Sequence, residues 1–289
     1  MMTTLSPQRL WIDTMLTGIA PVIWGSTYIV TTEWLPPDRP FTAALLRTLP
    51  AGAALVWYGK RVPAPGQWGR VTILAALNIG FFQALLFVSA YRLPGGVAAV
   101  IGAIQPLLLM ALGWSVDARR LARMAVIAAL AGIGGMAALL LSPGTRWDAA
   151  GIAAAAAGTL CMSAGTFLTR RWRTDLPVLA FTGWQLLLGG VMLAPLAFAF
   201  DPPLPALGLR EVFGYAYLCV VGAMLAYALW FRGVARLSPV AVSSLGLLSP
   251  ITAVVLGWIV LSQRLGGAAL AGLVVVLLSI FAVQWATRH

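Results

Sequence analysis

The side chains that could do chemistry in this chain are polar or aromatic residues that stand singly inside long apolar stretches. The set comprises Trp24, Tyr28, Asn78, Gln83, Gln105, Tyr227, Trp230, Ser244 and Ser249, together with one cation, Arg47. Amides, hydroxyls and indoles form hydrogen bonds and stack, but they need a neighbouring base to become nucleophiles. The single histidine is the last residue, His289, and the acids do not cluster. These residues therefore predict a binding site and no catalytic site.

Metal or cofactor binding is not expected from the remaining residues. Cys161 and Cys219 stand far apart in apolar stretches, so they form neither a metal-binding cluster nor a disulfide framework. The segment 132–137 (GIGGMA) matches a dinucleotide-binding pattern, but it lies inside an apolar stretch with no preceding strand. Close packing between helices explains these glycines better. We expect no cofactor and no metal.

The composition indicates which elements must position the candidate side chains. Hydrophobic residues make up 61% of the 289 residues and charged residues 9%, and the mean hydropathy is +0.91. Soluble domains average roughly 45–50% apolar and about 25% charged residues, so this chain has too little polar surface for water. It is predicted to be an integral protein of the lipid bilayer. The net charge of +11 does not predict nucleic-acid binding, because the basic residues are scattered between apolar segments.

Apolar stretches bounded by charges, proline and glycine predict an all-α fold of ten membrane-spanning helices. The expected spans are 12–33, 41–59, 71–91, 95–116, 121–141, 149–169, 178–200, 212–233, 238–261 and 266–286. An even number places both termini on one side, which then holds more basic residues than the other. Those on the terminal side are Arg9, Lys60, Arg61, Arg70, Arg119, Arg120, Arg123, Arg170, Arg171, Arg173, Arg232, Arg236 and Arg288, against Arg39, Arg92, Arg146, Arg210 and Arg264. The positive-inside rule assigns the richer side to the cytoplasm.

The two halves of the chain resemble each other. Shifting the sequence by 144 residues aligns 84–121 with 228–265 without a gap. The matched positions include Arg92 and Arg236, Gly102 and Gly246, Pro106 and Pro250, and they place Gln83 opposite Tyr227. We therefore divide the chain into two repeats of five helices, 1–144 and 145–289. Because five is odd, the second repeat must enter the membrane from the opposite side, as in many secondary transporters that bind substrate where inverted repeats meet.

Arg47 is the one full charge well inside an expected span. An arginine near a helix centre costs at least about 2.5–3.5 kcal/mol on insertion scales, so it should face a cavity or a polar partner. It could bind the carboxylate of a substrate. The alternative, which we favour, is that it fixes its helix to backbone carbonyls of a neighbour.

Two dipeptides, Gln105–Pro106 and Ser249–Pro250, occupy equivalent positions near mid-span. A proline inside a helix frees a carbonyl four residues back, which falls at Gly102 and Gly246. We interpret these segments as hinges in a cavity wall, and a simple kink satisfied by neighbouring helices is the alternative. The expected hinge residues are Gly102, Pro106, Gly246 and Pro250, and the expected wall residues are Gln105, Ser244 and Ser249.

Amide and aromatic side chains supply the other candidate contacts. Asn78 and Gln83 lie in one expected helix, and Tyr227 and Trp230 lie in the equivalent helix of the second repeat. A few amide or hydroxyl groups beside aromatic surface suit a small zwitterionic substrate. Hydrogen bonding between helices is the alternative for the amides, and core packing is the alternative for the aromatic rings. The further aromatic candidates are Trp24 and Tyr28.

Four features of the sequence are shared with a known family: WGSTY at 24–28, Arg47, AYRLPGGVAAVIGAIQP at 90–106 and its echo ARLSPVAVSSLGLLSP at 235–250. Through them nearly the whole chain resembles the EamA-type ten-helix members of the drug/metabolite transporter superfamily, and it looks most like bacterial exporters of amino acids, including aromatic ones. The resemblance implies two five-helix repeats around a central cavity. Many members carry an acidic residue where this chain has Arg119 and Gln263, so a role for that carboxylate is not carried over.

We therefore expect a monomeric transporter, and no enzyme, that exports amino acids or related small metabolites by alternating access. Asp13 and Glu33 bracket the first helix, and the other six of the eight acids lie in loops or at span ends. Without a titrating group at mid-depth, obligatory proton coupling is not expected. The alternatives are a polyspecific drug exporter of the same superfamily and, less favoured, a lipid-modifying membrane enzyme. Abundant alanine and an excess of arginine over lysine indicate a bacterial genome and hence an inner membrane.

Overall fold

A bundle of long helices accounts for the described part of the chain. The structure is a computed structural model that describes residues 7–93, 95–118, 121–141, 148–172, 174–260 and 266–287, and within these ranges every regular element is helical. Eight helices there are long and apolar enough to cross a membrane. The all-α membrane fold predicted from the composition is thereby confirmed. The predicted boundary between 144 and 145 lies outside the described residues.

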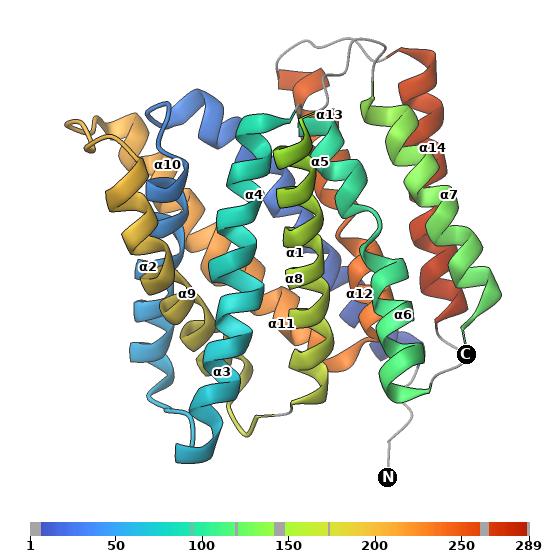
Figure 1. The fold of residues 1–289 in the computed structure, drawn as a ribbon, viewed down its shortest axis with the longest axis horizontal. Coiled ribbons are helices and arrows are strands. Elements are labelled where there is room, and N and C mark those ends of the chain that lie inside the picture. The colour runs from blue at the N-terminus through green and yellow to red at the C-terminus, as the bar shows by residue number, and fades with distance from the viewer. Residues whose placement is uncertain are drawn as a thin grey trace.

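The described elements follow the expected spans closely, with several spans divided into shorter helices (Figure 1). They are α1 (Pro7–Trp34), α2 (Pro40–Gly59), the 3₁₀ turn η1 (Pro65–Gln67), α3 (Trp68–Ala75), the π-helical η2 (Ala76–Gly80), α4 (Phe81–Arg92), α5 (Gly95–Gly102), α6 (Gln105–Asp117), α7 (Arg123–Leu140), α8 (Ala149–Arg171), α9 (Val178–Phe200), α10 (Leu209–Cys219), the π-helical η3 (Val220–Leu225), α11 (Ala226–Arg236), α12 (Pro239–Leu245), α13 (Leu248–Val260) and α14 (Gly267–Ala286).

Equivalent elements of the two halves run in opposite directions. In Figure 1 both termini lie at one end of the bundle, which we call the terminal end; the other end, where α1 and α4 finish, is the far end. The rod α3–η2–α4 begins at the terminal end and finishes at the far end. The equivalent rod α10–η3–α11 runs from the far end to the terminal end, and α5–α6 and α12–α13 are opposed in the same way.

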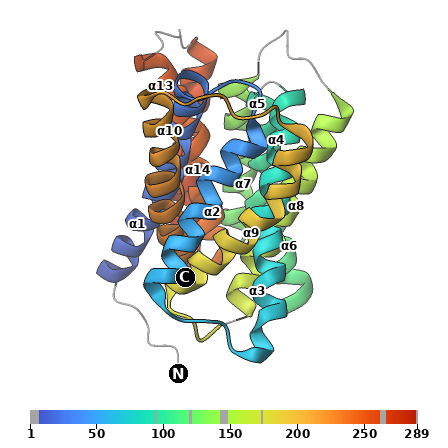
Figure 2. The same cartoon turned by 90° about the vertical axis from the view of Figure 1, so that its left-hand side faces the viewer.

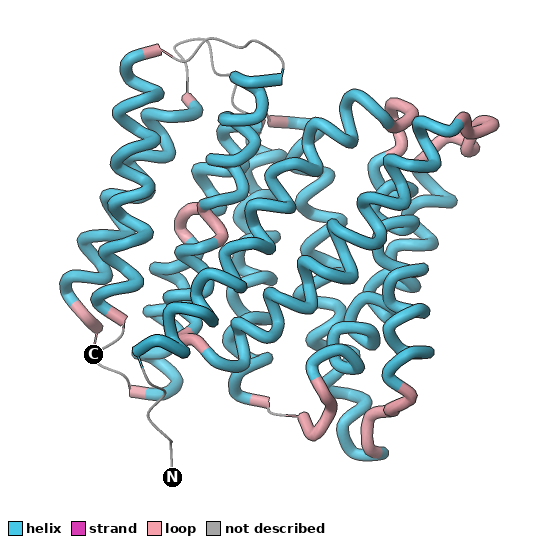
Figure 3. Tube along the Cα trace, turned by 180° about the vertical axis from the view of Figure 1, so that it is seen from behind, coloured by secondary structure: helices cyan, strands magenta, loops and turns pink. Residues whose placement is uncertain are grey.

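Four interruptions of the α-helical pattern stand at matching positions, two in each half. The π segments η2 and η3 divide the two long rods, although the apolar pattern predicts continuous helices there. The spans expected at 95–116 and 238–261 are broken in two, with turns between α5 and α6 and between α12 and α13. Figure 3 shows loop inside the bundle as well as at its ends. Backbone groups at membrane depth are therefore diverted from regular helical bonding, which membrane proteins tolerate where the chain is surrounded by protein.

Two pairs of equivalent helices pack backbone to backbone through glycine. Figure 2 shows α2 and α9 side by side, and a Cβ added to Gly52 of α2 would lie 2.2 Å from the Leu187 nitrogen of α9. In the pair α7 and α14, a Cβ on Gly272 would lie 2.5 Å from the carbonyl oxygen of Gly135. Only glycine permits so close an approach, as expected for small-residue helix contacts in membranes. We call these two contacts the glycine seams. They lie on opposite sides of the bundle (Figure 1), and we call the helices between them the centre.

Candidate functional site

A side-chain hydrogen bond joins the two halves at the centre. Gln83 of α4 donates from Nε2 to the hydroxyl of Tyr227 on α11 over 3.0 Å, and the two residues are 144 positions apart, the spacing of the repeat. They are 1% and 2% exposed. Equivalent positions of the two halves therefore contact each other directly. The sequence repeat pairs these residues, and the structure brings them together.

The second π segment presents a backbone carbonyl to two side chains. Trp24 of α1 donates from Nε1 to the Gly222 oxygen over 3.0 Å, and Arg47 of α2 donates from Nη2 to the same oxygen over 3.1 Å. In a regular α-helix this carbonyl would accept from the Ala226 amide, which here donates to Val221 and Ala223 instead. The π segment thus links α1, α2 and η3 at one oxygen. Neither composition nor motifs predict a role for Gly222, because the atom that accepts these bonds is its backbone carbonyl oxygen.

Arg47 has contacts that fit both of its predicted roles. Its bond to the Gly222 carbonyl fixes α2 against η3, as a structural role requires. Its guanidinium carbon also lies 5.8 Å from the centre of the Tyr227 ring, within the range of a cation–π contact. The Nε–H is buried and has no hydrogen-bonding partner among the described residues. This N–H group can therefore still donate a hydrogen bond to a carboxylate or carbonyl oxygen.

The first π segment makes the corresponding links with a side chain. Asn78 of η2 donates from Nδ2 to the Gln185 oxygen of α9 over 2.7 Å and to the Thr169 hydroxyl of α8 over 3.1 Å. Asn78 and Gln185 are 1% and 0% exposed. The predicted site residue Asn78 is thus part of an interhelical network, the alternative that the sequence left open. Thr169 was missed, since a single threonine in an apolar helix carries no distinguishing signal.

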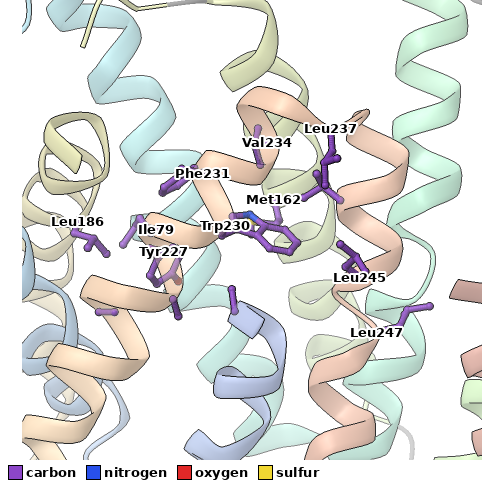
Figure 4. Packing of buried hydrophobic residues seen from close by; sticks show 14 of the residues in the cluster. Ile79, Met162, Leu186, Tyr227, Trp230, Phe231, Val234, Leu237, Leu245 and Leu247 are labelled. Atoms are coloured by element: carbon purple, nitrogen blue, oxygen red, sulfur yellow. The ribbon is translucent and has the colours of Figure 1, made fainter. Parts of the chain in front are cut away.

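Aromatic rings fill the space beside the Gln83–Tyr227 bond. The Trp24 ring centre lies 4.9 Å from that of Tyr227 and 5.2 Å from that of Trp230. Figure 4 shows Trp230 extending from α11 toward Leu245 and Leu247 at the α12–α13 break. Trp230 is 1% exposed, and its indole N–H has no hydrogen-bonding partner in the described part of the chain. Trp24 is half-buried, so this cluster extends from the packed core to a more open face.

The two helix breaks correct the expected pattern of free carbonyls. The Gly246 carbonyl accepts from the Ser249 amide over 3.1 Å, and the amide of Leu107 donates to Ile104 over 3.0 Å. Three-residue bonds of this kind tighten the chain, so the prediction that the Gly246 carbonyl is free was wrong. Pro106 stands at the start of α6 and does not kink a continuous helix. Pro250 likewise lies in the first turn of α13.

The remaining predicted residues lie at different distances from this centre. Gln105 approaches it, because its Oε1 and the Trp230 ring both lie within 4.0 Å of the position a Gly246 Cβ would occupy. Ser244 does not join it: its hydroxyl accepts from Gln284 of α14 over 3.1 Å. Ser249 is half-buried at the start of α13. Tyr28 lies on α1, but its side chain is outside what the structure describes, and Gly102 ends α5 with open space beside it.

An acid and two arginines form a separate group near the terminal end. Asp13 lies inside α1 and is 2% exposed, although the sequence places it at the border of the first helix. The expectation fails because α1 begins at Pro7, one and a half turns earlier than the apolar stretch indicates. Asp13 Oδ1 accepts from Arg232 Nη2 over 2.5 Å and from Arg236 Nη1 over 3.2 Å. Glu33 is exposed at the end of α1, as predicted.

A cavity of about 560 Å³ also opens at the terminal end. Its walls come from α6, α7, α8, α12 and α14, with Met110, Phe167 and Val240 among the apolar members. Arg170 and Arg171 also line it; Arg171 pairs with Asp117, and Arg170 donates to the Leu237 carbonyl. No group of acids, cysteines and histidine in the described residues could hold a metal ion.

Comparison with known proteins gives one consistent result. The model of the EamA-like transporter family matches twice, over residues 13–141 and 149–285. Protein PecM of Dickeya dadantii is 42% identical over 267 residues, which cover 92% of this chain and 90% of that protein. The probable amino-acid metabolite efflux pump of Salmonella typhimurium is 23% identical, with 93% of each chain covered. A solved crystal structure of another protein has the same fold, with a TM-score of 0.80 at 20% identity over 96% of this chain and 97% of that one.

Proposed function

Because the chain belongs to the EamA-like transporter family, we propose that it exports amino acids or related small metabolites across a bacterial inner membrane, with both termini in the cytoplasm. The family makes it a multi-pass membrane transporter of small molecules. The substrate class is supported by the Salmonella relative, which is named a probable amino-acid metabolite efflux pump. The thirteen-to-five bias of basic residues supports the orientation.

The observation that carries the proposal is the meeting of the two halves at Gln83 and Tyr227. Around this bond stand an indole, a guanidinium and a backbone carbonyl, contributed by α1, α2 and η3. A small molecule with a carboxylate and an apolar or aromatic side chain needs such groups. Transporters built from inverted repeats bind substrate at this kind of junction, and rocking of one repeat against the other exposes it to each side in turn.

Export without obligatory proton exchange is the energetic part of the proposal. The central group contains Arg47 and, among the described residues within it, no acid. Arginine does not release a proton under physiological conditions. Asp13 is paired with two arginines near the terminal end and does not contact the Gln83–Tyr227 bond. The substrate's own gradient then drives net export.

A polyspecific drug exporter is the second candidate, since the same family architecture serves both. Cationic drugs call for an acidic or purely aromatic wall, whereas Arg47 would repel them. The amide, hydroxyl and guanidinium groups at the centre favour substrates with oxygen acceptors. Monomeric action belongs to the proposal for metabolites, because one chain supplies both halves of the junction.

Flux measurements in proteoliposomes test these statements together. Radiolabelled amino acids should equilibrate across membranes that hold the purified protein, and unlabelled amino acids should compete while cationic dyes should not. Flux should persist when no pH gradient is imposed. Accumulation driven by a pH gradient alone would contradict uncoupled export, and competition by dyes alone would favour the drug exporter. Phosphatase and fluorescent reporters fused to the C-terminus check its cytoplasmic position.

A further inference from the structure

A buried acid and two partly exposed arginines tie α1 to α11 at the terminal end. Asp13 is 2% exposed and accepts from both arginines through one oxygen, at 2.5 Å and 3.2 Å. Its second oxygen and the Arg232 Nη1 are buried and have no hydrogen-bonding partner among the described residues. Burying charges costs more than one incomplete set of bonds returns. Stability of the fold is therefore a poor explanation for the burial of Asp13, and a conformational role is the better one.

A related ion pair stands at the opposite end of the molecule. Arg92 ends α4 as Arg236 ends α11, and it faces Asp148, the residue before α8. Here the two charges are 3.7 Å apart, and their side chains are 53% and 43% exposed. Asp148 also accepts from the Gly151 amide over 2.6 Å. Exposed pairs of this kind contribute little, about 0–1 kcal/mol. The arginines Arg236 and Arg92 are similarly exposed, at 51% and 53%, but the acid is buried at the terminal end and exposed at the far end, and its contacts are shorter at the terminal end.

Helix packing shows the same asymmetry. At the terminal end, α6 contacts α12, and a Cβ on Gly233 of α11 would lie 2.3 Å from the Thr17 hydroxyl of α1. The helices that continue α6 and α12 toward the far end, α5 and α13, have different neighbours: α5 packs mainly on α7 and α8, and α13 packs mainly on α1. Every described residue from Ala241 to Leu245 of α12 is buried, whereas much of α13 is partly exposed. At the terminal end, α1 and α11 are therefore packed closely where the charge group joins them, whereas the cavity at this end opens among α6, α7, α8, α12 and α14.

We propose that Asp13, Arg232 and Arg236 form a lock that holds α1 and α11 together at the terminal end and opens once in each transport cycle. Arg92 and Asp148 are its counterpart at the far end, closing when the terminal lock opens. These are positioning residues, since the structure gives them no contact with the central Gln83–Tyr227 bond. The inference rests on the proposed transport function for its meaning, but its test measures accessibility and needs no substrate.

The experiment uses a cysteine at a buried position on α12, where a reagent added from the terminal side should react only after the lock opens. Ser243 of α12 is 1% exposed, and Ser243→Cys is nearly isosteric. In a background with Cys161→Ala and Cys219→Ala, a membrane-impermeant maleimide is added from the terminal side of proteoliposomes of known orientation. Asp13→Asn should raise the labelling rate of Ser243→Cys roughly tenfold, in the range of a coupling between two conformational states. The parent protein should label slowly.

Two further variants guard against misfolding and against a general loosening of the bundle. Arg236→Gln removes the longer and more exposed contact, so it should fold normally and raise labelling by a smaller factor. Arg92→Gln is the matched control, because it breaks the counterpart pair; it should leave labelling unchanged or slow it. Size-exclusion profiles report folding. Parental labelling rates in folded Asp13→Asn and Arg236→Gln, or equal acceleration by Arg92→Gln, would overturn the lock, whatever the flux assays show about substrate.

Discussion

The two π segments occupy equivalent places in the two halves but are tied to their neighbours by different chemistry. In η2, the side chain of Asn78 reaches Gln185 on α9 and Thr169 on α8. In η3, the residue at the equivalent position is Gly222, and its backbone carbonyl accepts from Trp24 on α1 and Arg47 on α2. Each segment thus joins the first two helices of the other half-bundle. One half does so with neutral amides and the other with a backbone oxygen that attracts a cation.

This difference assigns separate tasks to the two halves. A network of neutral amides at 0–1% exposure is fully enclosed and holds helices together. A backbone carbonyl leaves the side chains of its partners partly available, and both Trp24 and Arg47 are half-buried. We therefore expect the contacts around η2 to contribute more to stability and the contacts around η3 to contribute more to transport. Four substitutions separate these two effects.

Removing the cation should have the largest effect on transport. Arg47→Ala deletes the bond to the Gly222 carbonyl and the contact with the Tyr227 ring, and hydrogen bonds to charged groups contribute about 1.5–3 kcal/mol. We expect flux in proteoliposomes to fall roughly ten- to hundredfold. Arg47→Lys keeps the charge without the planar fork and should recover only part of it. Parental flux in Arg47→Ala would show that the contacts around η3 have no special part in transport.

Crowding the amide network should have the largest effect on stability. A Cβ on Gly165 of α8 would lie 2.1 Å from Asn78 Oδ1, so Gly165→Ala must displace the amide from its partners. We expect a loss of about 1–3 kcal/mol, the usual cost of overpacking, seen as a lower Tm in detergent. Gly158→Ala on the same helix is the control, because its nearest neighbour would be 3.5 Å away. Equal Tm values for both variants would remove the structural role of the amide network around η2.

The bond between the halves should have an intermediate effect on both properties. Tyr227→Phe removes the hydroxyl that accepts from Gln83, and interhelical bonds in membranes contribute about 0.6 kcal/mol. We expect a small fall in Tm and a fewfold fall in flux. A double-mutant cycle with Gln83→Leu measures the coupling directly. Strictly additive changes would mean that the two residues do not act as a pair.

The smallest effect is expected at Gly222 itself. A Cβ there would have its nearest neighbours at 3.6–3.8 Å, and the carbonyl that serves Trp24 and Arg47 would remain. Gly222→Ala should therefore leave flux within about twofold and raise stability by up to about 1 kcal/mol, the helix-propensity difference. Gly165→Ala and Gly222→Ala together give the sharpest comparison of the contacts around η2 with those around η3. A large loss of flux in Gly222→Ala would place the close contact, and not the carbonyl, at the origin of the effect.

The apolar pattern predicts the helical segments because lipid imposes it on every spanning helix. The span expected at 178–200 is found at Val178–Phe200, and the one expected at 41–59 at Pro40–Gly59. The π segments could not be predicted, since a shift of backbone bonding from four to five residues leaves hydropathy unchanged. Proline marks the break before α6, but the pattern does not tell a kink from a break.

The candidate site was predictable where it depends on side chains and on the repeat. The repeat pairs Gln83 with Tyr227, and the rarity of charge inside a span singles out Arg47. Gly222 was not predictable, because its carbonyl gains a role only through the π segment. Asp13 was misplaced because polar residues at the start of α1 hide the true beginning of the helix. Contact of any of these residues with substrate remains a prediction.

The glycine seams also bear on how the protein coexists with the membrane potential. In α2–α9 and α7–α14, backbones approach too closely for a side chain, let alone a file of water, to lie between them. Each elementary charge that crosses the membrane releases about 2.3 kcal/mol per 100 mV, so even a narrow wetted slit would discharge the cell. The seams insulate the two flanks of the bundle. Control of leakage during transport then falls to the centre, where several buried polar atoms, among them Arg47 Nε and the Trp230 indole nitrogen, have no hydrogen-bonding partner among the described residues.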